Sequence, residues 1–397
     1  MRKVITFLGR QKKETTYQFE GVAYTGRVFA EALRQFVDYD RMLVFVTPEA
    51  KTDAWPVLAA LGDSRIQAVD IPCGETTEEM WGIFSAVTEC VDEEETVVFD
   101  ITHGLRSLPF LVFLFAAYLK SAKRVTIEAI YYGAFELGKD RPAPVVDLSD
   151  FVTMLDWLTA TDQFTQTGNA GRLADLIRMQ GDSEGATVLA SHALSRISRA
   201  AFLCQPFTLI EQVDDLDRAL ESTRMALHTS ARPFDVVHSE VSKTFGQFRA
   251  DRADPRAMLR AQYRLIEWYY GNNQLMLAVT LAREWLVSAV TYRLERPIDL
   301  GREARQEMEH AITGLERIGS RPGFTVACLN EYGRRIHDEW PDWRELRGLC
   351  SALASVRNTL DHAEHQKDAM KLEKIVKKID TVIIPKLRGL AEAWGII

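Results

Sequence analysis

The sequence has few cysteines, and they are not arranged as metal ligands or as a disulfide framework. Cys73, Cys90, Cys204, Cys328 and Cys350 lie far apart, without a Cys-x-x-Cys pair or a Cys/His cluster at the spacing of zinc ligands. This scarcity predicts a reduced, cytoplasmic protein and excludes a zinc site of the usual kind. We expect neither a metal ion nor a resident cofactor.

Long apolar runs and an excess of positive charge are also missing. The apolar segment Leu111–Leu119 is too short to cross a bilayer, and the first residues lack the apolar core of a signal peptide. We therefore expect a soluble protein without a membrane partner. The formal net charge of −8 repels polyanions, so a nucleic acid would have to bind at a local basic patch.

The N-terminal part contains short β-branched runs that alternate with helical stretches. This alternation predicts a Rossmann-like, doubly wound parallel sheet with helices on both faces. The predicted strands are Lys3–Leu8, Arg41–Thr47, Arg65–Ile71, Thr96–Ile101 and Val125–Tyr132. The predicted helices are Val22–Phe36, Asp53–Leu61, Thr77–Val91 and Ser107–Lys120, the last with Ser107 as its cap and Pro109 in its first turn.

Strand signals fade beyond Phe151, and consecutive helices are predicted up to the C-terminus. The polar stretch Phe234–Pro255 suggests a joint, and the segments after it predict a helical bundle. We therefore expect an α/β ligand-sensing domain (residues 1–160), a helical connecting region (161–250) and a C-terminal helical bundle (251–397).

Polar residues follow three of the predicted strands, at the edge where open α/β sheets bind ligands. Helix N-terminal N–H groups and two arginines favour an anion, and an aromatic ring offers a surface for stacking a base, so a phosphate-bearing ligand is predicted. For each residue alone, a cap or a turn is the stronger interpretation; for the cluster, ligand binding is. The candidates are Gly9, Arg10, Thr102, His103, Gly104, Arg106, Ser107, Tyr132 and Gly133.

Neither a Gly-x-Gly-x-x-Gly nor a Gly-x-x-x-x-Gly-Lys-Ser/Thr motif follows the first predicted strand. This argues against a dinucleotide cofactor and against ordinary nucleotide hydrolysis.

In the predicted C-terminal bundle, Arg357 and His362 stand five residues apart, with Asn358 between them. An imidazole can exchange protons with the ribose 2′-hydroxyl and the leaving oxygen, and a guanidinium can stabilise charge on the phosphate, so the pair suits RNA cleavage without metal. The spacing alone is weak evidence, because 34 Arg and 8 His give roughly 0.7 such pairs by chance. A second pair does occur, at Arg305 and His310.

The surroundings distinguish the two pairs. An apolar stripe precedes Arg357 and predicts a helix packed against a neighbour, which would preorganise a polar site at its end; the stripe is Leu346, Leu349, Leu353 and Val356. Charges surround Arg305 on all sides, as on a solvated helix face. Arg357 and Asp361 are expected to form an ion pair. An ordinary surface pair with a surface histidine is the alternative.

Two segments taken together resemble a known family. They are Asp100-Ile101-Thr102-His103-Gly104-Leu105-Arg106-Ser107-Leu108-Pro109 and Arg357-Asn358-Thr359-Leu360-Asp361-His362. In this order they resemble the CRISPR-associated ribonucleases that join a CARF sensor domain to a HEPN nuclease domain. The resemblance implies catalytic roles for Arg357 and His362, with Asn358 in support, and ligand contacts for the candidates at the sheet edge.

The same resemblance implies a homodimer, or a higher even-numbered oligomer, whose paired CARF domains bind a cyclic oligoadenylate. Binding would activate paired HEPN domains that cleave single-stranded RNA without metal, leave a cyclic phosphate and act in antiviral defence. A ring of four adenylates is favoured over one of six.

Other functions stay open from the sequence. The helical part could recruit a partner, for example in transcriptional control, although no helix-turn-helix with a basic recognition helix is evident. The N-terminal cleft could itself cleave the bound messenger through Thr102, His103 and Arg106. Both polar clusters could also be purely structural.

Overall fold

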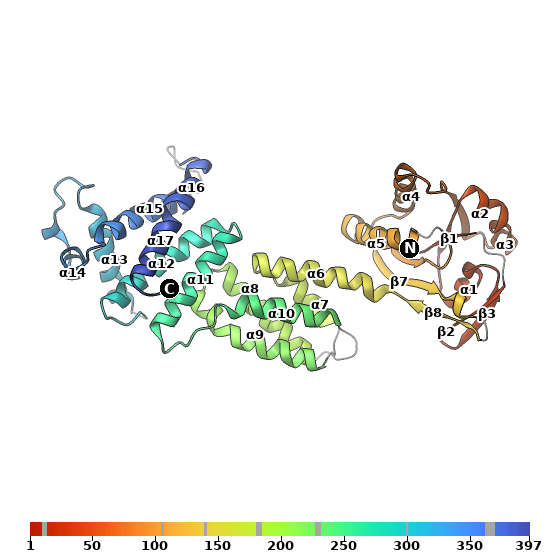
Figure 1. Ribbon diagram of the computed structural model, residues 1–397, viewed down its shortest axis with the longest axis horizontal. Helices are drawn as coiled ribbons and strands as arrows, with labels where there is room; N and C mark the ends of the chain where they lie inside the picture. Colours follow the sequence, from red (N-terminus) through yellow and green to blue (C-terminus); the bar gives the residue numbers. More distant parts are fainter. Residues whose placement is uncertain are drawn as a thin grey trace. The chain divides into compact units, whose positions relative to one another are not determined.

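The computed structural model describes residues 1–9, 14–104, 107–138, 141–179, 185–226, 232–298, 301–361 and 370–397, except for the side chains of residues 226, 232–237 and 361. These residues form two compact units, Met1–Asp156 and Trp157–Ile397. The boundary falls inside helix α6 (Ser149–Thr167). Figure 1 labels the elements of each unit.

The first unit contains an eight-stranded sheet in the order β3-β2-β8-β7-β6-β1-β4-β5. Its central part, β7-β6-β1-β4-β5, is parallel and coincides with the five predicted strands. Almost all of β1 is buried on both faces, which is typical of a central parallel strand. The five strands are β1 (Arg2–Leu8), β4 (Arg41–Val46), β5 (Ile66–Asp70), β6 (Thr96–Asp100) and β7 (Thr126–Gly133).

Helices cover both faces of this sheet and enclose a separate core on each side. One core includes residues of α1 (Phe29–Phe36), α2 (Pro48–Asp53) and α3 (Trp55–Ala59). The other includes residues of α4 (Thr77–Glu89) and α5 (Leu108–Lys123). The predicted doubly wound arrangement is therefore confirmed.

Three strands at one side of the sheet were not predicted: β2 (Thr15–Phe19), β3 (Val22–Gly26) and β8 (Ala143–Asp147). β8 runs antiparallel to β7, and β2 and β3 form an antiparallel pair, so the whole sheet is mixed. The predicted helix Val22–Phe36 is wrong in its first part, which forms β3. Gly21, with φ +84°, lets the chain turn back there, and strand pairing then outweighs the helical pattern.

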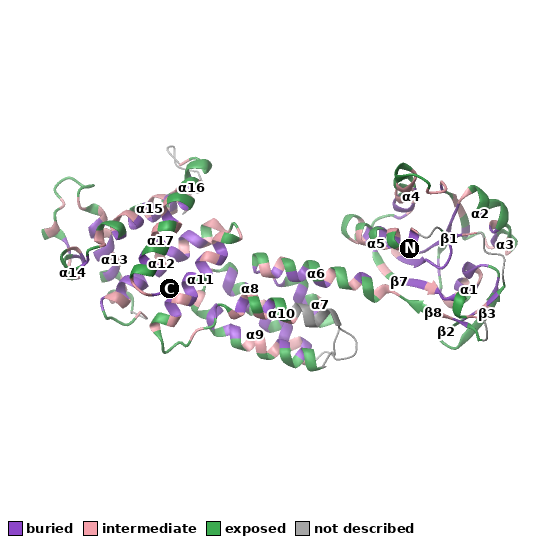
Figure 2. Ribbon diagram, viewed as in Figure 1, coloured by how far each residue is buried: buried purple, intermediate pink, exposed green. Residues whose placement is uncertain are grey.

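Among its described residues, the second unit contains helices and connecting turns without a strand, so the predicted fold class is confirmed. One hydrophobic core runs through it, from Trp157 near its start to Ile396 near its end (Figure 2). Besides the later part of α6, its elements are α7 (Gly171–Met179), α8 (Ala186–Phe202), α9 (Pro206–Ala226), α10 (Arg232–Gly246), α11 (Pro255–Gly271), α12 (Leu275–Arg293), α13 (Arg302–Arg317), α14 (Glu331–Glu339), α15 (Trp343–Asp361), α16 (Leu372–Lys378), the π-helical turn η3 (Ile379–Ile383) and α17 (Ile384–Ala393).

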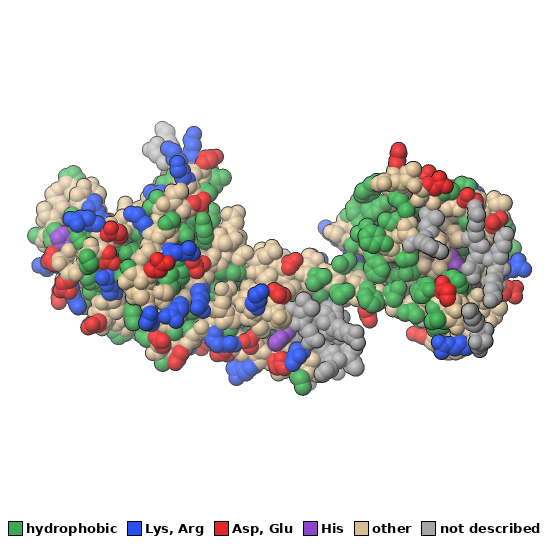
Figure 3. All heavy atoms as spheres, in the orientation of Figure 1, with side chains coloured by type: hydrophobic (Ala, Val, Ile, Leu, Met, Phe, Trp, Pro, Cys, Tyr) green, Lys and Arg blue, Asp and Glu red, His purple; other side chains and the backbone are tan. Residues whose placement is uncertain are grey.

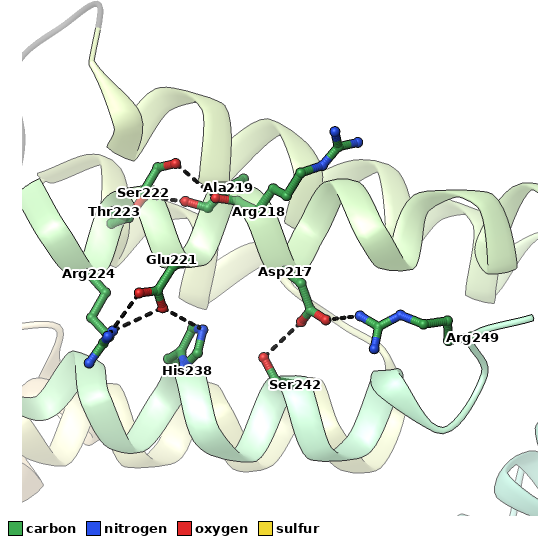
Figure 4. A network of polar contacts seen from close by, with 10 residues as sticks. All are labelled: Asp217, Arg218, Ala219, Glu221, Ser222, Thr223, Arg224, His238, Ser242 and Arg249. Carbon is green, nitrogen blue, oxygen red and sulfur yellow. Dashed lines mark hydrogen bonds and ion pairs between the residues drawn. The ribbon is translucent and has the colours of Figure 1, made fainter.

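The predicted polar joint Phe234–Pro255 is wrong over much of its length, because it forms most of α10. Its polar side chains bind α9 (Figure 4). Asp217 accepts a hydrogen bond from Ser242 Oγ at 2.8 Å and forms an ion pair with Arg249, and His238 Nε2 lies 3.5 Å from a carboxylate oxygen of α9. The core is continuous across residue 250, and a domain division there stays a prediction.

Helix α12 is long and apolar enough to cross a membrane by length and composition alone. However, 61% of that stretch is buried inside the structure. This is the pattern of a core helix, and α11, α13 and α15 pack against it.

Candidate functional site

The loops after β1 and β6 touch each other at the carboxyl edge of the sheet. A Cβ atom placed on Gly9 would lie 3.1 Å from the backbone nitrogen of Gly104. Gly104 itself has φ +116°, and a Cβ there would lie 2.7 Å from Leu108 Cδ1. Glycine is therefore required at Gly104 for backbone conformation and space. Two of the predicted ligand loops are thus brought together.

A cavity of about 320 Å³ lies at this edge and takes in Gly9 and Gly104. Two carboxylates that no sequence motif indicated also line it, those of Glu49 and Glu75. The described lining contains no Lys or Arg, and the predicted cations Arg10 and Arg106 lie outside the described residues. The other lining residues are Phe7, Leu8, Phe45, Thr47, Ala50, Ile71, Cys73 and Leu108.

The thiol of Cys73 donates a hydrogen bond to Glu49 Oε2 at 3.4 Å. This contact raises the pKa of the thiol, because the neighbouring carboxylate disfavours a thiolate. Cys73 in this setting is a neutral donor in the wall of the cavity and a poor nucleophile.

Thr102 holds the sheet edge together through hydrogen bonds on both sides. Its N–H donates to Asp100 Oδ1 at 2.7 Å, and its Oγ1 accepts from the N–H of Gly133, also at 2.7 Å. Thr6 Oγ1 donates to the second carboxylate oxygen of Asp100 at 2.6 Å. Asp100 is completely buried, and burial raises its pKa to about 6. The Thr102 hydroxyl is thus already engaged in linking β6 to β7.

His103 is 8% exposed, and its ring lies against Phe135 with the ring centres 5.6 Å apart. Burial lowers its pKa to about 4, against a smaller opposite effect of Glu136, so the imidazole is neutral near pH 7. Its Nε2 has no hydrogen-bond partner among the described residues. Buried polar atoms are seldom left unpaired, which points to a partner from outside these residues. Because the pKa of His103 is low, its neutral imidazole is a weak base, which argues against proton transfer by this residue.

Of the three other predicted ligand residues described in this unit, Tyr132 and Gly133 have structural roles and Ser107 lacks the one predicted for it. Ser107 occupies the N-cap position of α5 but makes no side-chain cap hydrogen bond, so its predicted capping is wrong, while Pro109 does lie in the first turn. Tyr132 donates its hydroxyl proton to Glu136 at 2.8 Å. A Cβ on Gly133 would lie 2.8 Å from the Phe29 ring, so close packing requires glycine there. Ligand contacts at these residues stay predictions.

In the second unit, Arg357 and Asn358 lie near the end of α15, after the apolar stripe. All four stripe residues are buried, as predicted. Arg357 is half-buried and Asn358 is exposed. His362 and the side chain of Asp361 lie outside the described residues, so the proposed Arg357–Asp361 ion pair stays a prediction.

Arg357 and Asn358 line a cavity of about 230 Å³ between α12, α13 and α15. Three charged residues from the other two helices join them: Arg283, Glu309 and Glu316. Burial raises the pKa of Glu316, and the positive charges of Arg283 and Arg317 partly oppose this. These residues lie up to 74 positions away from Arg357 in the sequence. No local pattern could have assigned them to the same site.

The rival pair, Arg305 and His310, is built differently. Arg305 forms ion pairs with Glu284 and, at 3.4 Å, with Glu309 Oε1, while His310 is exposed. Helix α13 also buries an apolar face, so the prediction that charges surround it on all sides is wrong. The Arg305 guanidinium is therefore already paired with the carboxylates of Glu284 and Glu309.

Among the described residues, no group of three or more His, Cys, Asp or Glu side chains is placed to hold a metal ion. Chemistry at Arg357 that requires no metal stays a prediction.

Comparison with known proteins shows what the chain is similar to. Residues 153–252 match the family defined by the second domain of the CRISPR-associated protein MJ1674. MJ1674 itself, from Methanocaldococcus jannaschii, is 28% identical over 219 residues, which cover 54% of this chain and 32% of MJ1674. The chain is a relative of CRISPR-associated proteins. The relationship inferred from the two motifs is thereby confirmed at this level.

Two limits to this relationship follow from the same figures. The chain spans about a third of the length of MJ1674. The family match covers the region from α6 to just beyond α10, whereas Arg357 and the sheet edge lie outside it. The functions of both sites are therefore proposed below and are not taken from MJ1674.

A solved structure can also be superimposed over the full chain, although the similarity of the two folds is low. Enterococcus italicus Csm6 bound to cyclic hexa-2′-fluoro-hexa-dAMP gives a TM-score of 0.43 at 10% identity, over 100% of this chain and 95% of that chain. The relationship to CRISPR-associated proteins rests on the sequence matches and not on this similarity.

Proposed function

We propose that this chain is a CRISPR-associated endoribonuclease of the CARF–HEPN kind, which cleaves single-stranded RNA without metal when a cyclic oligoadenylate binds its N-terminal unit. The observation that carries the proposal is the place of Arg357 and Asn358, beside a cavity at the end of a buried helix face. A charged side chain held by packed neighbours is preorganised, which a nuclease without metal requires.

In the proposed reaction, the imidazole of His362 takes the proton of the ribose 2′-hydroxyl and returns one to the leaving 5′-oxygen. The 2′-oxygen attacks the adjacent phosphorus, the bond to the 5′-oxygen breaks, and a cyclic phosphate remains. The Arg357 guanidinium stabilises the additional charge on the phosphate oxygens, and the Asn358 amide supports the site. DNA lacks the 2′-hydroxyl and resists this reaction.

The activator is proposed to bind at the carboxyl edge of the sheet, where the loops after β1 and β6 meet. The cavity there is open to a nucleotide, and the buried His103 Nε2 lacks a partner among the described residues. Carboxylates in the wall suit the amino groups and hydroxyls of a nucleoside, and the phosphates would need Arg10 and Arg106. A cyclic tetra-adenylate is the preferred candidate. It activates only if it binds the active arrangement more tightly than the inactive one.

A homodimer, or a higher even-numbered oligomer, belongs to the same proposal. Helix α5 leaves Phe110, Leu114 and Tyr118 exposed at intervals of four residues, and Trp81 of α4 is exposed as well. Figure 3 shows hydrophobic side chains gathered on the surface of this unit. A second copy is the proposed partner for this face, because α5 begins beside the ligand loops and a two-fold contact would bring two of them together. The proposed compartment is the cytoplasm.

The deciding experiment is an RNA-cleavage assay in EDTA, with cyclic oligoadenylates of four and six units added separately. Wild-type protein should cleave single-stranded RNA, and His362→Ala should lower the rate by about 10²–10⁴, the usual contribution of a general acid–base group. Undiminished cleavage by the variant would contradict the assignment of His362 as the general acid–base group. Intact RNA under every condition would favour the rival function, a messenger-binding regulator without nuclease activity.

A further inference from the structure

Lysine is concentrated in one short segment of this acidic chain. Five of its fourteen lysines lie between residues 371 and 386, although the whole molecule carries a net charge of −8. Four of them occupy α16 and the residue before it: Lys371, Lys374, Lys377 and Lys378, here called the lysine face. Three of these four are exposed, and Lys378 is half-buried. Figure 3 shows Lys and Arg side chains gathered at α16.

Two ordinary explanations of such a group do not apply here. Lysines often stabilise the C-terminal end of a helix, but the helix continues from Lys378 through η3 into α17. Exposed lysines also pair with carboxylates four residues away. Among the described residues, none of the four lies within ion-pair distance of a carboxylate, although Glu373 precedes Lys377 by four positions. The lysine face therefore presents uncompensated positive charge.

The lysine face lies at the same end of the bundle as Arg357. Helices α16, η3 and α17 all contact α15, and Ile375 and Ile383 share its core. At the other end, a Cβ on Gly348 of α15 would lie 2.5 Å from Lys386 Nζ of α17. Helix α15 thus meets α17 near its own start and also contacts η3 and α16, so the two helical segments run antiparallel. Arg357 lies nine residues after Gly348, and Lys377 lies nine residues before Lys386. In antiparallel helices both lie roughly 13 Å from the Gly348–Lys386 contact along the helix axis, so Arg357 and Lys377 are at about the same level.

We propose that the lysine face binds the phosphate backbone of the single-stranded RNA on either side of the bond held at Arg357. The inference rests on the proposed nuclease function and names the surface that holds its substrate. Over the seven-residue rise from Lys371 to Lys378, about 10 Å, several ammonium groups can contact successive phosphates. The contacts are electrostatic, so they supply affinity without reading the base sequence. A single local patch also explains how a chain of net negative charge could hold a polyanion.

The test measures binding of a fluorescent single-stranded 2′-O-methyl RNA, which this chemistry cannot cleave, to the full-length chain at a series of KCl concentrations, with and without cyclic tetra-adenylate. The variant combines Lys374→Gln, Lys377→Gln and Lys378→Gln. Loss of three phosphate contacts should make the slope of log affinity against log salt shallower by about 2, and weaken binding about tenfold to a hundredfold at low salt.

A matched control combines Arg172→Gln, Arg196→Gln and Lys243→Gln, three exposed cations elsewhere in the same unit. It removes equal charge and should leave the salt slope unchanged. Equal losses in both variants, or none in either, would overturn the proposal; the second result would leave the lysine face to another anionic partner such as an acidic protein. Wild-type binding that is steeply salt-dependent and depends on the lysine face, without cleavage of ordinary RNA, would retain this surface and reject the nuclease.

Discussion

At the sheet edge of the first unit, Thr102, Gly104 and Gly133 hold backbone segments against one another. At the end of α15 in the second unit, Arg357 and Asn358 reach from a packed helix into a cavity shared with two other helices. In the first region, most predicted ligand residues have structural roles, and the cavity beside them is the proposed place for a ligand. In the second, the packing is supplied by the apolar stripe residues, and the two polar side chains line the cavity. The residues of a sequence motif can therefore either support the backbone around a candidate site or supply the polar side chains that line it.

The largest expected difference is between the two arginines that precede a histidine by five residues. Arg357→Ala should lower RNA cleavage by about 10²–10³, as expected when one donor to a developing charge is lost. Arg305→Ala should lower it by no more than about fivefold, because Arg305 is bound to Glu284 and Glu309 and its loss costs a surface ion pair of about 1 kcal/mol. Initial rates at saturating activator measure both. Equal losses would mean that the two pairs are equivalent and that the cavity beside α15 is not the site.

At the sheet edge, a methyl group on Gly104 should disrupt the scaffold. Gly104→Ala must adopt φ +116° and place its Cβ 2.7 Å from Leu108 Cδ1, so we expect the N-terminal unit to lose about 3 kcal/mol of stability and its response to activator. The control is Gly62→Ala, where φ is +65° but the space around a Cβ is open; its cost should be about 1 kcal/mol. Chemical denaturation followed by tryptophan fluorescence compares the two. A milder effect at Gly104 than at Gly62 would contradict the close contact described there.

Two buried groups of the first unit should respond to acid in opposite directions. The pKa of His103 is lowered to about 4 by burial, so its contribution to stability is complete above pH 6.5 and is lost as the pH falls through 4. The pKa of Asp100 is raised to about 6, so its contribution is complete below pH 3.8 and is lost as the pH rises through 6. Each amounts to at most about 3 kcal/mol, and the two largely cancel between pH 4 and 6.

Asp100→Asn separates these contributions, because Thr102 N–H can still donate to the side-chain oxygen and the Thr6 hydroxyl can accept from the new amide. The variant should lose stability between pH 6.5 and 4 much more steeply than the wild type. His103→Phe should show the opposite, a gain in relative stability on acidification. Urea unfolding at several pH values provides the measurement, and parallel profiles for all three proteins would contradict the assignment of both groups.

The smallest expected effect separates a cap from a ligand contact. Thr76 accepts a hydrogen bond from the N–H of Glu79 at 3.2 Å at the start of α4, so Thr76→Ala should cost about 1 kcal/mol. Ser107 makes no such bond, and Ser107→Ala should change stability by less than about 0.5 kcal/mol. The activator concentration for half-maximal cleavage, measured for both, tests the other role. A shift for Ser107→Ala alone would make Ser107 a ligand contact, and no shift would leave it without a role in binding.

The two regions also differ in how much of them the sequence could predict. Buried parallel strands such as β1 and β4 carry continuous apolar runs, and the stripe on α15 repeats with the helical period, so both were predicted correctly. β3 was missed because an edge strand with mostly exposed residues carries little apolar pattern. α10 was missed because its polar residues, among them Ser242, bind α9 instead of marking a loop.

The sequence by itself determined the order of the two units, the strands of the central sheet and the candidate pair at Arg357 and His362, because these depend on local periodicity and on short motifs. Only the tertiary structure decided that Gly9 meets Gly104, that Thr102 is committed to Gly133, and that Glu309 and Glu316 share a cavity with Arg357. The physical reason is that these contacts join segments far apart in the chain. Their existence depends on how buried helices and strands pack, and no local pattern records it.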